Sequence, residues 1–292
     1  MFNRICIIGV GLIGGSIARA AREQGLCSEI IGFGRIDDKE NLEQALQLKV
    51  IDRYSFDIQS AVEHADLVVI ATPVGSIKSV LSMLKPVWSE AIIYTDVGST
   101  KTNVVAAAAE LFGHVPANFV PAHPIAGAEQ SGVKAALPDL FKNKRLIITP
   151  SANTHPDSLA KVRLFWERLG AVISIMDVEH HDAVLAATSH LPHLLAFALV
   201  HMLGRKDEQV EIFKFAAGGF KDFTRIASSD PTMWLDISLA NKNQLLPLIE
   251  QLKHELNSLE LALDTNNSQQ LLETFTYARH ARQRFLDQFN NN

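Results

Sequence analysis

Two short segments carry the side chains best suited to proton transfer, and the first contains His123. This residue is followed by Pro124 at the start of the run His-Pro-Ile-Ala-Gly-Ala-Glu, which ends at Glu129. An imidazole has an unperturbed pKa near 6.5, so His123 is a candidate general base at neutral pH. A structural histidine satisfied by hydrogen bonds is an equally open interpretation.

The second segment is Ser189-His190-Leu191-Pro192-His193, in a helical stretch that Pro192 is expected to kink or break. Polar side chains beside such a break can face a ligand. His190 and His193 are close enough on a helix to suggest metal binding. Because no third ligand stands at a matching spacing, we predict no metal site. The nearby run Glu179-His180-His181-Asp182 is interpreted as the solvated first turn of a helix.

Three further residues offer a hydroxyl group or a positive charge. Ser99, in the run Asp-Val-Gly-Ser-Thr-Lys, could cap the following helix or present its hydroxyl to a ligand. Lys101 ends the same run and could simply hold that helix in place. Arg225 ends the run Gly-Gly-Phe-Lys-Asp-Phe-Thr-Arg, and its planar guanidinium could clamp a substrate carboxylate. An ion pair between domains or subunits is the alternative for Arg225.

A glycine turn near the N-terminus predicts a dinucleotide site. The run Gly9-Val10-Gly11-Leu12-Ile13-Gly14 follows an apolar strand and precedes a helical stretch. In this fingerprint Gly9 permits the tight turn, Gly11 lets the backbone approach a pyrophosphate, and Gly14 lets the helix pack on the strand. The helix N-terminus, which includes Leu12 and Ile13, then offers N–H groups to the phosphates. Thr72 and Pro73 follow another strand and should lie beside the cofactor.

The end of the second strand bears on the choice between NAD and NADP. Gly34 stands where a carboxylate for the ribose 2′-hydroxyl is usual, and Arg35 follows it. An arginine suits a 2′-phosphate, so the sequence slightly favours NADP. Asp37 and Asp38 are close enough to supply the missing carboxylate instead, and Arg35 could be a solvated surface cation.

The elements that must position these residues alternate between strand and helix in the first half of the chain. Such alternation, with strands apolar along their length, predicts a doubly wound, mostly parallel sheet of the Rossmann type. After about Met176 the pattern is helical throughout, which predicts domains at 1–176 and 177–292 packed tightly together. The expected strands are 4–8, 29–33, 67–71, 91–96, 118–122, 145–149 and 171–175, and the expected helical stretches after them include 183–203, 235–263 and 269–289.

The composition favours a small-molecule enzyme. With 27 Lys and Arg against 32 Asp and Glu, the net charge is −5, and there is no basic run for nucleic acid or an anionic membrane. No apolar run reaches the roughly 18 residues that span a bilayer, and the N-terminus lacks the features of a signal peptide. Cys6 and Cys27 are too few for a disulfide framework, so we expect two buried thiols and a cytoplasmic protein.

Taken together, five motifs resemble the prephenate/arogenate (cyclohexadienyl) dehydrogenase family of tyrosine biosynthesis. They are ordered as in that family and extend over nearly the whole chain. The resemblance implies a Rossmann domain followed by an all-helical C-terminal domain, similar to 6-phosphogluconate dehydrogenase. The motifs are Gly9 to Gly14, Asp96 to Lys101, His123 to Gly127, Ser189 to His193, and Gly219 to Arg225 with Trp234.

The resemblance also implies a reaction and a set of roles. Hydride would pass from ring C4 of the substrate to NAD(P), with loss of CO₂, to give 4-hydroxyphenylpyruvate or tyrosine. His123 would take the proton of the ring 4-hydroxyl, and Ser99 would bind that hydroxyl or orient the imidazole. Contacts to the substrate would come from Ser189, His193 and Arg225, with Glu129 gating the pocket.

Two further expectations come from the resemblance. The helical domain would form a homodimer, and the fingerprint at residue 9 leaves no room for a preceding chorismate mutase domain, which implies a monofunctional enzyme. The alternatives are another NAD(P)-dependent dehydrogenase with a helical domain, of the β-hydroxyacid type, or a nucleotide-binding protein without catalysis. The sequence does not distinguish prephenate from arogenate.

Overall fold

The computed structural model describes residues 1–128, 130–206 and 211–290. The chain forms two compact units, residues 1–244 and residues 245–292. The first unit holds the sheet and the helices that follow it, and every candidate residue described below belongs to this unit. The second unit holds most of α11 (Lys242–Asp264) and all of α12 (Ser268–Asn290).

Among the described residues, the strands of the first unit form one sheet of eight strands in the order β3-β2-β1-β4-β5-β6-β7-β8. All neighbours are parallel except β6 and β7, which are antiparallel. The predicted Rossmann-type fold with its mostly parallel sheet is therefore confirmed. The strands are β1 (Phe2–Ile8), β2 (Cys27–Phe33), β3 (Arg53–Ser55), β4 (Leu67–Ile70), β5 (Ile93–Asp96), β6 (Phe119–Pro124), β7 (Arg145–Ile148) and β8 (Val172–Ile175).

Helices cover both faces of the sheet because successive strand residues point to opposite sides. Ile5 and Ile7 of β1 belong to one core, whereas Cys6 and Ile8 belong to the other. The first core packs on α1 (Leu12–Glu23), α2 (Lys39–Gln47) and α6 (Pro156–Arg168). The second packs on α3 (Ile58–Val62), α4 (Ile77–Leu84) and α5 (Thr102–Phe112).

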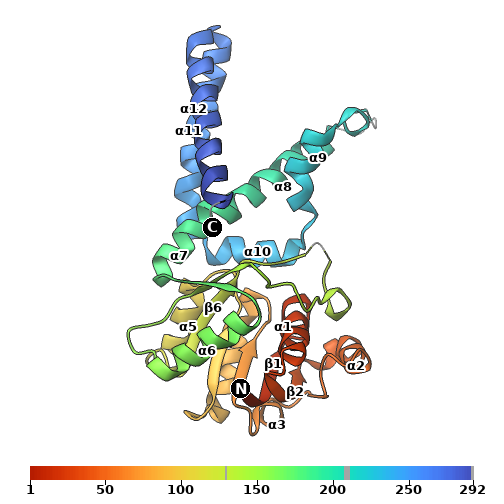
Figure 1. Cartoon of the computed structure of the whole chain (residues 1–292). Helices are drawn as coiled ribbons and strands as arrows, with labels where there is room; N and C mark the ends of the chain where they lie inside the picture. The colour runs from red at the N-terminus through yellow and green to blue at the C-terminus, as the bar shows by residue number, and fades with distance from the viewer. Residues whose placement is uncertain (129, 207–210, 291–292) are drawn as a thin grey trace. The chain divides into compact units, whose positions relative to one another are not determined.

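The helices after β8 continue the same compact unit. They are α7 (Val178–Leu185), α8 (Leu191–Gly204), α9 (Gly218–Thr224) and α10 (Pro231–Ala240). Trp234 and Ile237 of α10 lie in the second core of the sheet. Helix α10 and the N-terminus lie at opposite ends of this domain, and α10 is at the end toward which β1 runs (Figure 1). The strands stop after β8, beside the expected boundary at residue 176, while the compact unit runs on to Gln244.

Two breaks in the helical half have identifiable causes. The break expected at Pro192 is a π-helical segment, Ala186–His190, directly before α8, with Pro192 in the first turn of that helix. The stretch predicted as one helix over 235–263 is two helices that part at Asn241. The Asn241 side chain is turned inward, where its Nδ2 donates to the carbonyl of Asp182 and to Nδ1 of His190.

The segment Val178–Gly204 is long and apolar enough to cross a membrane, with a mean hydropathy of 1.6 in its best window. The expectation that no apolar run reaches that length is therefore wrong for this segment. This segment carries His181, Asp182 and His190, which are buried and hydrogen-bonded within the folded unit. Such a polar face suits the interior of this domain and not a lipid environment.

The two cysteines have different environments. Cys6 is fully buried, as expected, but Cys27 is half-buried, so the expectation of a second buried thiol is wrong. Burial raises the pKa of Cys6 to about 12 and that of Cys27 to about 11. Both thiols are therefore protonated near neutral pH and are poor nucleophiles.

Candidate functional site

The glycine turn has the geometry of a cradle for a ligand. Gly9 has a φ of +92°, and a Cβ there would lie 2.8 Å from the carbonyl oxygen of Ala71. A Cβ on Gly14 would lie 2.2 Å from the Gly9 carbonyl oxygen. At Gly11, by contrast, a Cβ would meet no described atom within 4 Å. Gly9 and Gly14 therefore serve the fold, whereas Gly11 leaves an open approach to the backbone.

Helix α1 begins at this turn with its N–H groups available. Its N-cap is Gly11, which has no side chain to cap the helix, and its first turn contains no acidic residue. Leu12 and Ile13, the first two residues of the helix, line a cavity at the turn. An uncapped helix N-terminus beside an open glycine backbone suits an anionic phosphate group.

A first cavity of about 480 Å³ lies beside the glycine turn. Its lining includes Gly9, Gly11, Thr72 and Pro73, so the turn and the end of β4 meet there. Its rim includes Arg35 and Asp38.

These two rim residues interact with each other. Arg35 donates to Asp38 Oδ2 from its backbone N–H at 2.8 Å and from Nε at 3.4 Å. The Arg35 side chain is 76% exposed. The rim thus offers a cation to a 2′-phosphate and a carboxylate to a 2′-hydroxyl.

A second cavity, of about 470 Å³, continues from the first and shares Gly11, Thr72 and Pro73 with it. Ser99 lies on its wall and is half-buried. The hydroxyl of Thr72 is buried without a hydrogen-bond partner in the described structure. An unpaired buried hydroxyl is costly unless a ligand or water completes it, so Thr72 fits a polar ligand in this cavity.

Ser99 does not cap the helix that follows it, contrary to one of the two interpretations of this residue. Helix α5 begins after Lys101, and no side-chain cap comes from its own N-cap residue. Asp182 of α7 takes that part: its Oδ1 accepts from the Lys101 N–H and its Oδ2 from the Thr102 N–H, both at 2.8 Å. Ser99, which also lines the second cavity, is thus available to a ligand there.

A third cavity of about 660 Å³ contains the polar residues of the helical half. Its lining includes His123, Ser189, His193 and Arg225, so residues from β6, the π-helical segment, α8 and the end of α9 meet at one place. Ala128, Ser229 and Met233 line both this cavity and the second one, so the three cavities form a continuous row.

His193 is held rigidly in the third cavity. Its ring stacks on Trp234, with centroids 3.6 Å apart, and its Nδ1 lies 2.9 Å from the carbonyl oxygen of Ser189. Because a carbonyl can only accept, Nδ1 carries the proton, which leaves Nε2 as an acceptor in the neutral ring. Burial lowers the pKa of His193, so this ring is neutral near pH 7.

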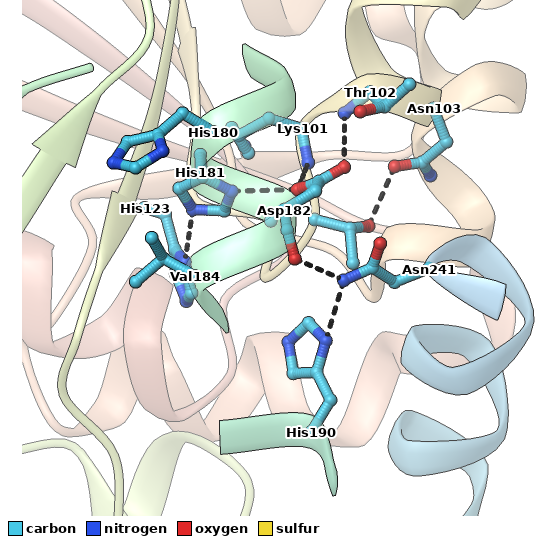
Figure 2. A network of polar contacts seen from close by, with 12 residues as sticks. Lys101, Thr102, Asn103, His123, His180, His181, Asp182, Val184, His190 and Asn241 are labelled. Atoms are coloured by element: carbon cyan, nitrogen blue, oxygen red, sulfur yellow. Dashed lines mark hydrogen bonds and ion pairs between the residues drawn. The ribbon is translucent and has the colours of Figure 1, made fainter. Parts of the chain in front are cut away.

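His123 lies at the end of β6 and belongs to a chain of buried polar groups (Figure 2). Its Nδ1 is 2.9 Å from Nε2 of His181, and Nδ1 of His181 is 2.8 Å from Oδ1 of Asp182. The exposed fractions of these side chains are 8%, 0% and 1%. Burial, and then the positive charge that His181 or Lys101 can carry, lowers the pKa of His123 well below its usual range. A neutral His123 is a base and not an acid at pH 7.

Lys101 lies on the other side of this chain. Its side chain is fully buried, where Nζ forms an ion pair with Asp96 and donates to the carbonyl oxygen of Ala122 at 2.9 Å. Ala122 directly precedes His123, so this bond fixes the end of β6. Lys101 was expected to hold the helix that follows it, but its Nζ instead contacts the ends of two strands, β5 and β6.

His181 and Asp182 are residues that the sequence interpretation missed. The interpretation as a solvated first turn is wrong for both, since they are buried, whereas Glu179 and His180 of the same run are exposed. One signal could have identified Asp182: it precedes Ser189 and His193 by seven and eleven residues, the spacing of a single helix face. The expected gate, Glu129, lies outside the described residues.

The remaining features concern metals. Within residues 1–128, 130–206 and 211–290, no group of three His, Cys, Asp or Glu side chains is arranged to hold a metal ion. The histidine pair that suggested a metal site is engaged elsewhere, since Nδ1 of His190 accepts from Asn241 and Nδ1 of His193 bonds to the Ser189 carbonyl.

Two family models match the chain, one on each side of residue 176. The model described as "Prephenate dehydrogenase, nucleotide-binding domain" matches residues 17–175. The model described as "Prephenate dehydrogenase, dimerization domain" matches residues 177–277.

Two curated relatives are similar over nearly the full chain. The cyclohexadienyl dehydrogenase of Zymomonas mobilis is 37% identical over 286 residues, which are 97% of this chain and 96% of the relative. The prephenate dehydrogenase of Bacillus subtilis is also 37% identical over 286 residues, which are 97% of this chain and 76% of the relative.

Two solved structures are similar in fold. Prephenate dehydrogenase from A. aeolicus, solved with hydroxyphenyl propionate and NAD⁺, has a TM-score of 0.90 and 36% identity, covering 98% of this chain and 99% of its own. Arogenate dehydrogenase from Synechocystis has a TM-score of 0.79 and 28% identity, covering 97% of this chain and 99% of its own.

Proposed function

The chain belongs to the prephenate dehydrogenase family, and from that premise we propose that it oxidises prephenate, arogenate or both with loss of CO₂. The products are 4-hydroxyphenylpyruvate from prephenate and tyrosine from arogenate. The observation that carries the proposal is the row of three cavities, in which a glycine cradle at one end leads past Ser99 to His123, His193 and Arg225 at the other.

The first two cavities fit a nicotinamide dinucleotide. The open space over Gly11, the uncapped start of α1 and the unpaired Thr72 hydroxyl would bind its phosphates and polar groups. Leu12, Ile13 and Pro73 would supply the apolar walls. When bound, the cofactor accepts the hydride that leaves ring C4 of the substrate.

In the third cavity we assign the proton transfer to His123. Its lowered pKa keeps the imidazole neutral, so it can take the proton of the 4-hydroxyl as hydride leaves C4. Ser99, on the wall of the adjoining cavity, would hydrogen-bond that hydroxyl. His193 and Ser189 would contact the ring from the helical side, and Arg225 would bind a substrate carboxylate.

We propose that both dinucleotides bind, with NADP favoured by Arg35. The exposed guanidinium can turn to a 2′-phosphate, whereas Asp38 can accept a hydrogen bond from the 2′-hydroxyl of NAD. Arg35→Ala should therefore raise the Kd for NADP about tenfold and leave that for NAD within about twofold. Asp38→Asn is the matched reverse change, which should weaken NAD selectively. Equal effects of Arg35→Ala on both cofactors would overturn this assignment.

We further propose a nucleotide-binding domain at 1–176 and a homodimer formed through residues 177–292. Large apolar side chains are exposed on the isolated chain, which is typical of a subunit interface. On α10 they include Leu235 and Leu239, and on α11 and α12 they include Leu246, Leu261, Leu263, Leu272 and Phe275. Light scattering should give twice the chain mass of 32.1 kDa, and a monomeric mass at micromolar concentration would refute the dimer.

We also propose that the enzyme works in the cytoplasm. The two free thiols suit a reducing compartment. Fractionation of expressing cells should place the activity with the cytoplasmic marker enzymes.

The experiment that tests the proposed function combines each substrate with each cofactor. Prephenate and arogenate are incubated separately with NAD and NADP, and the reduced cofactor and aromatic product are measured in the same sample. We expect equal amounts of both in at least one of the four combinations. Absence of reduced cofactor in all four, from folded protein that binds the cofactor, would refute the proposal.

A further inference from the structure

We propose that Asp182 and His181 are positioning residues for the proton transfer from the substrate to His123. We also propose that the resulting positive charge passes from His123 to His181. This inference rests on the proposed function for the reaction that it serves. Its geometric part, the tautomer of each ring, is independent of the substrate.

The argument begins at Asp182, whose carboxylate is buried and fully engaged. It accepts from the N–H groups of Lys101 and Thr102 and lies 2.8 Å from Nδ1 of His181. Burial acts to raise the pKa of Asp182, but the hydrogen bonds from His181, Thr102 and Lys101 outweigh it and the pKa is lowered. The group is therefore an ionised carboxylate, which can only accept hydrogen bonds.

The ionised carboxylate of Asp182 determines which nitrogen of His181 carries a proton, and His181 in turn determines this for His123. We propose that His181 carries a single ring proton on Nδ1, from which it donates to Asp182, so that its Nε2 accepts. Nδ1 of His123 lies 2.9 Å from that Nε2 and must donate to it. The proton of neutral His123 is consequently on Nδ1, and its Nε2 carries the lone pair. Without this chain either tautomer of His123 could form, and the one with a proton on Nε2 could not act as a base from that atom.

The same contacts provide a place for the charge. When Nε2 of His123 takes the proton of the 4-hydroxyl, the O–H bond breaks and its electron pair forms the carbonyl, while the C4–H bond breaks as hydride leaves. An imidazolium then arises in a buried position. Transfer of the Nδ1 proton to Nε2 of His181 breaks one N–H bond and forms another, and His123 becomes neutral. The positive charge then lies on His181, in direct contact with the carboxylate of Asp182. A buried cation is far more stable beside a carboxylate than without one.

Hydrogen bonds to backbone groups of Asp182 and α5 hold the Asp182 carboxylate in a fixed position. Asp182 bridges two segments that are far apart in sequence, because it caps α5 while it lies on α7 (Figure 2). Asn241 donates to the backbone carbonyl of Asp182 at 2.8 Å and so fixes the same residue from the start of α11. The carboxylate that orients the base is thus held by three elements.

The first test measures the tautomers directly in the full chain without ligands. Nitrogen-15 chemical shifts of labelled histidine above pH 7 should show a protonated Nδ1 and an unprotonated Nε2 for both His123 and His181. His181→Phe should turn the His123 signals into a mixture of tautomers. A proton on Nε2 of His123 in the unmodified chain would overturn the proposal, whatever the enzyme's activity.

The second test uses a graded series of variants in the assay of the proposed reaction. In His181→Gln the amide oxygen can still accept from His123, but the side chain cannot take a proton, so we expect kcat to fall about tenfold. His181→Phe loses both properties, and we expect a fall of about 10²-fold or more. The cofactor Kd should stay within about twofold in both. Equal kcat values for Gln, Phe and the unmodified chain would contradict the proposal.

A matched control and an isotope measurement separate positioning from packing. His180→Gln replaces the exposed imidazole next to His181 on α7 and leaves the contacts among His123, His181 and Asp182 in place, so it should keep kcat within about twofold. The solvent isotope effect on kcat should depend non-linearly on the deuterium fraction in the unmodified chain and linearly in His181→Gln. A linear dependence in both would refute the second proton transfer. Asp182→Asn also removes a helix cap, so the His181 variants, which leave that cap intact, carry the test.

Discussion

Two glycines of the same turn should respond to the same substitution in opposite ways. A methyl group on Gly14 would lie 2.2 Å from the Gly9 carbonyl oxygen and 2.9 Å from Cγ2 of Ile7, so the backbone must shift. Overpacking of this kind costs about 1–3 kcal/mol. At about 2–4 °C per kcal/mol for a chain of this size class, Gly14→Ala should lower the Tm by about 2–12 °C.

At Gly11 the same methyl group meets no described atom within 4 Å, and the backbone, with φ −93° and ψ −150°, suits alanine. The only structural loss is a weaker N-cap, at most about 1 kcal/mol. The methyl group does, however, occupy the approach to the pyrophosphate. If it costs the bound state about 1.4–2.8 kcal/mol, Gly11→Ala should raise the cofactor Kd about 10- to 100-fold.

The assays are a fluorescence titration of each variant with the reduced cofactor and thermal unfolding followed by circular dichroism. Gly218→Ala is the control, since a Cβ there also meets no described atom within 4 Å and the residue lines none of the three cavities. It should change neither quantity. If Gly11→Ala binds the cofactor as tightly as the unmodified chain, the assignment of the glycine cradle is wrong.

Three other substitutions test the third cavity and the buried helical face. His123→Asn should lower kcat by about 10² or more with an unchanged cofactor Kd, and full turnover would reject His123 as the base. Arg225→Ala should raise the substrate KM about 10- to 100-fold with a smaller change in kcat, because hydrogen bonds to charged groups contribute about 1.5–3 kcal/mol. An unchanged KM would show that another residue binds the substrate carboxylate. Burial lowers the pKa of His190 to about 4 in the folded chain, whereas a histidine in the unfolded chain has a pKa near 6.5. As the pH falls, the unfolded chain therefore takes up the His190 proton before the folded chain does. The free energy of unfolding should be at its full value above pH 6.5 and should fall by about 3 kcal/mol as the pH drops to 4. Denaturant unfolding at several pH values should show a flatter profile for His190→Gln, and an unchanged profile would contradict the assignment.

The parts of the fold that the sequence predicted are those with local signals. The strand, glycine turn and helix at residues 2–23 follow from residue types within a short window. Seven strands were predicted, but β3 (Arg53–Ser55) was missed because it has only three half-buried residues at the edge of the sheet. The antiparallel pairing of β6 and β7 has no local signal either.

The same distinction applies to the site. His123 and Ser189 were found because a strand end and a proline-interrupted helix are visible along the chain. The burial of Asp182 depends on α5, which lies some eighty residues earlier in the sequence, and no local pattern contains that contact. Helix-face spacing could have indicated that Asp182 is buried, but not that its carboxylate caps α5 and bonds to His181 beside the proposed base.

The most direct test of the proposed chemistry follows a single hydrogen atom. Prephenate or arogenate labelled with deuterium at ring C4 is converted with the accepted cofactor, and the reduced cofactor, product and CO₂ are analysed by mass spectrometry. We expect one deuterium in each molecule of reduced cofactor, with one molecule of CO₂ and one aromatic product. Deuterium in the solvent, or an aromatic product formed without a labelled reduced cofactor, would contradict hydride transfer at this site.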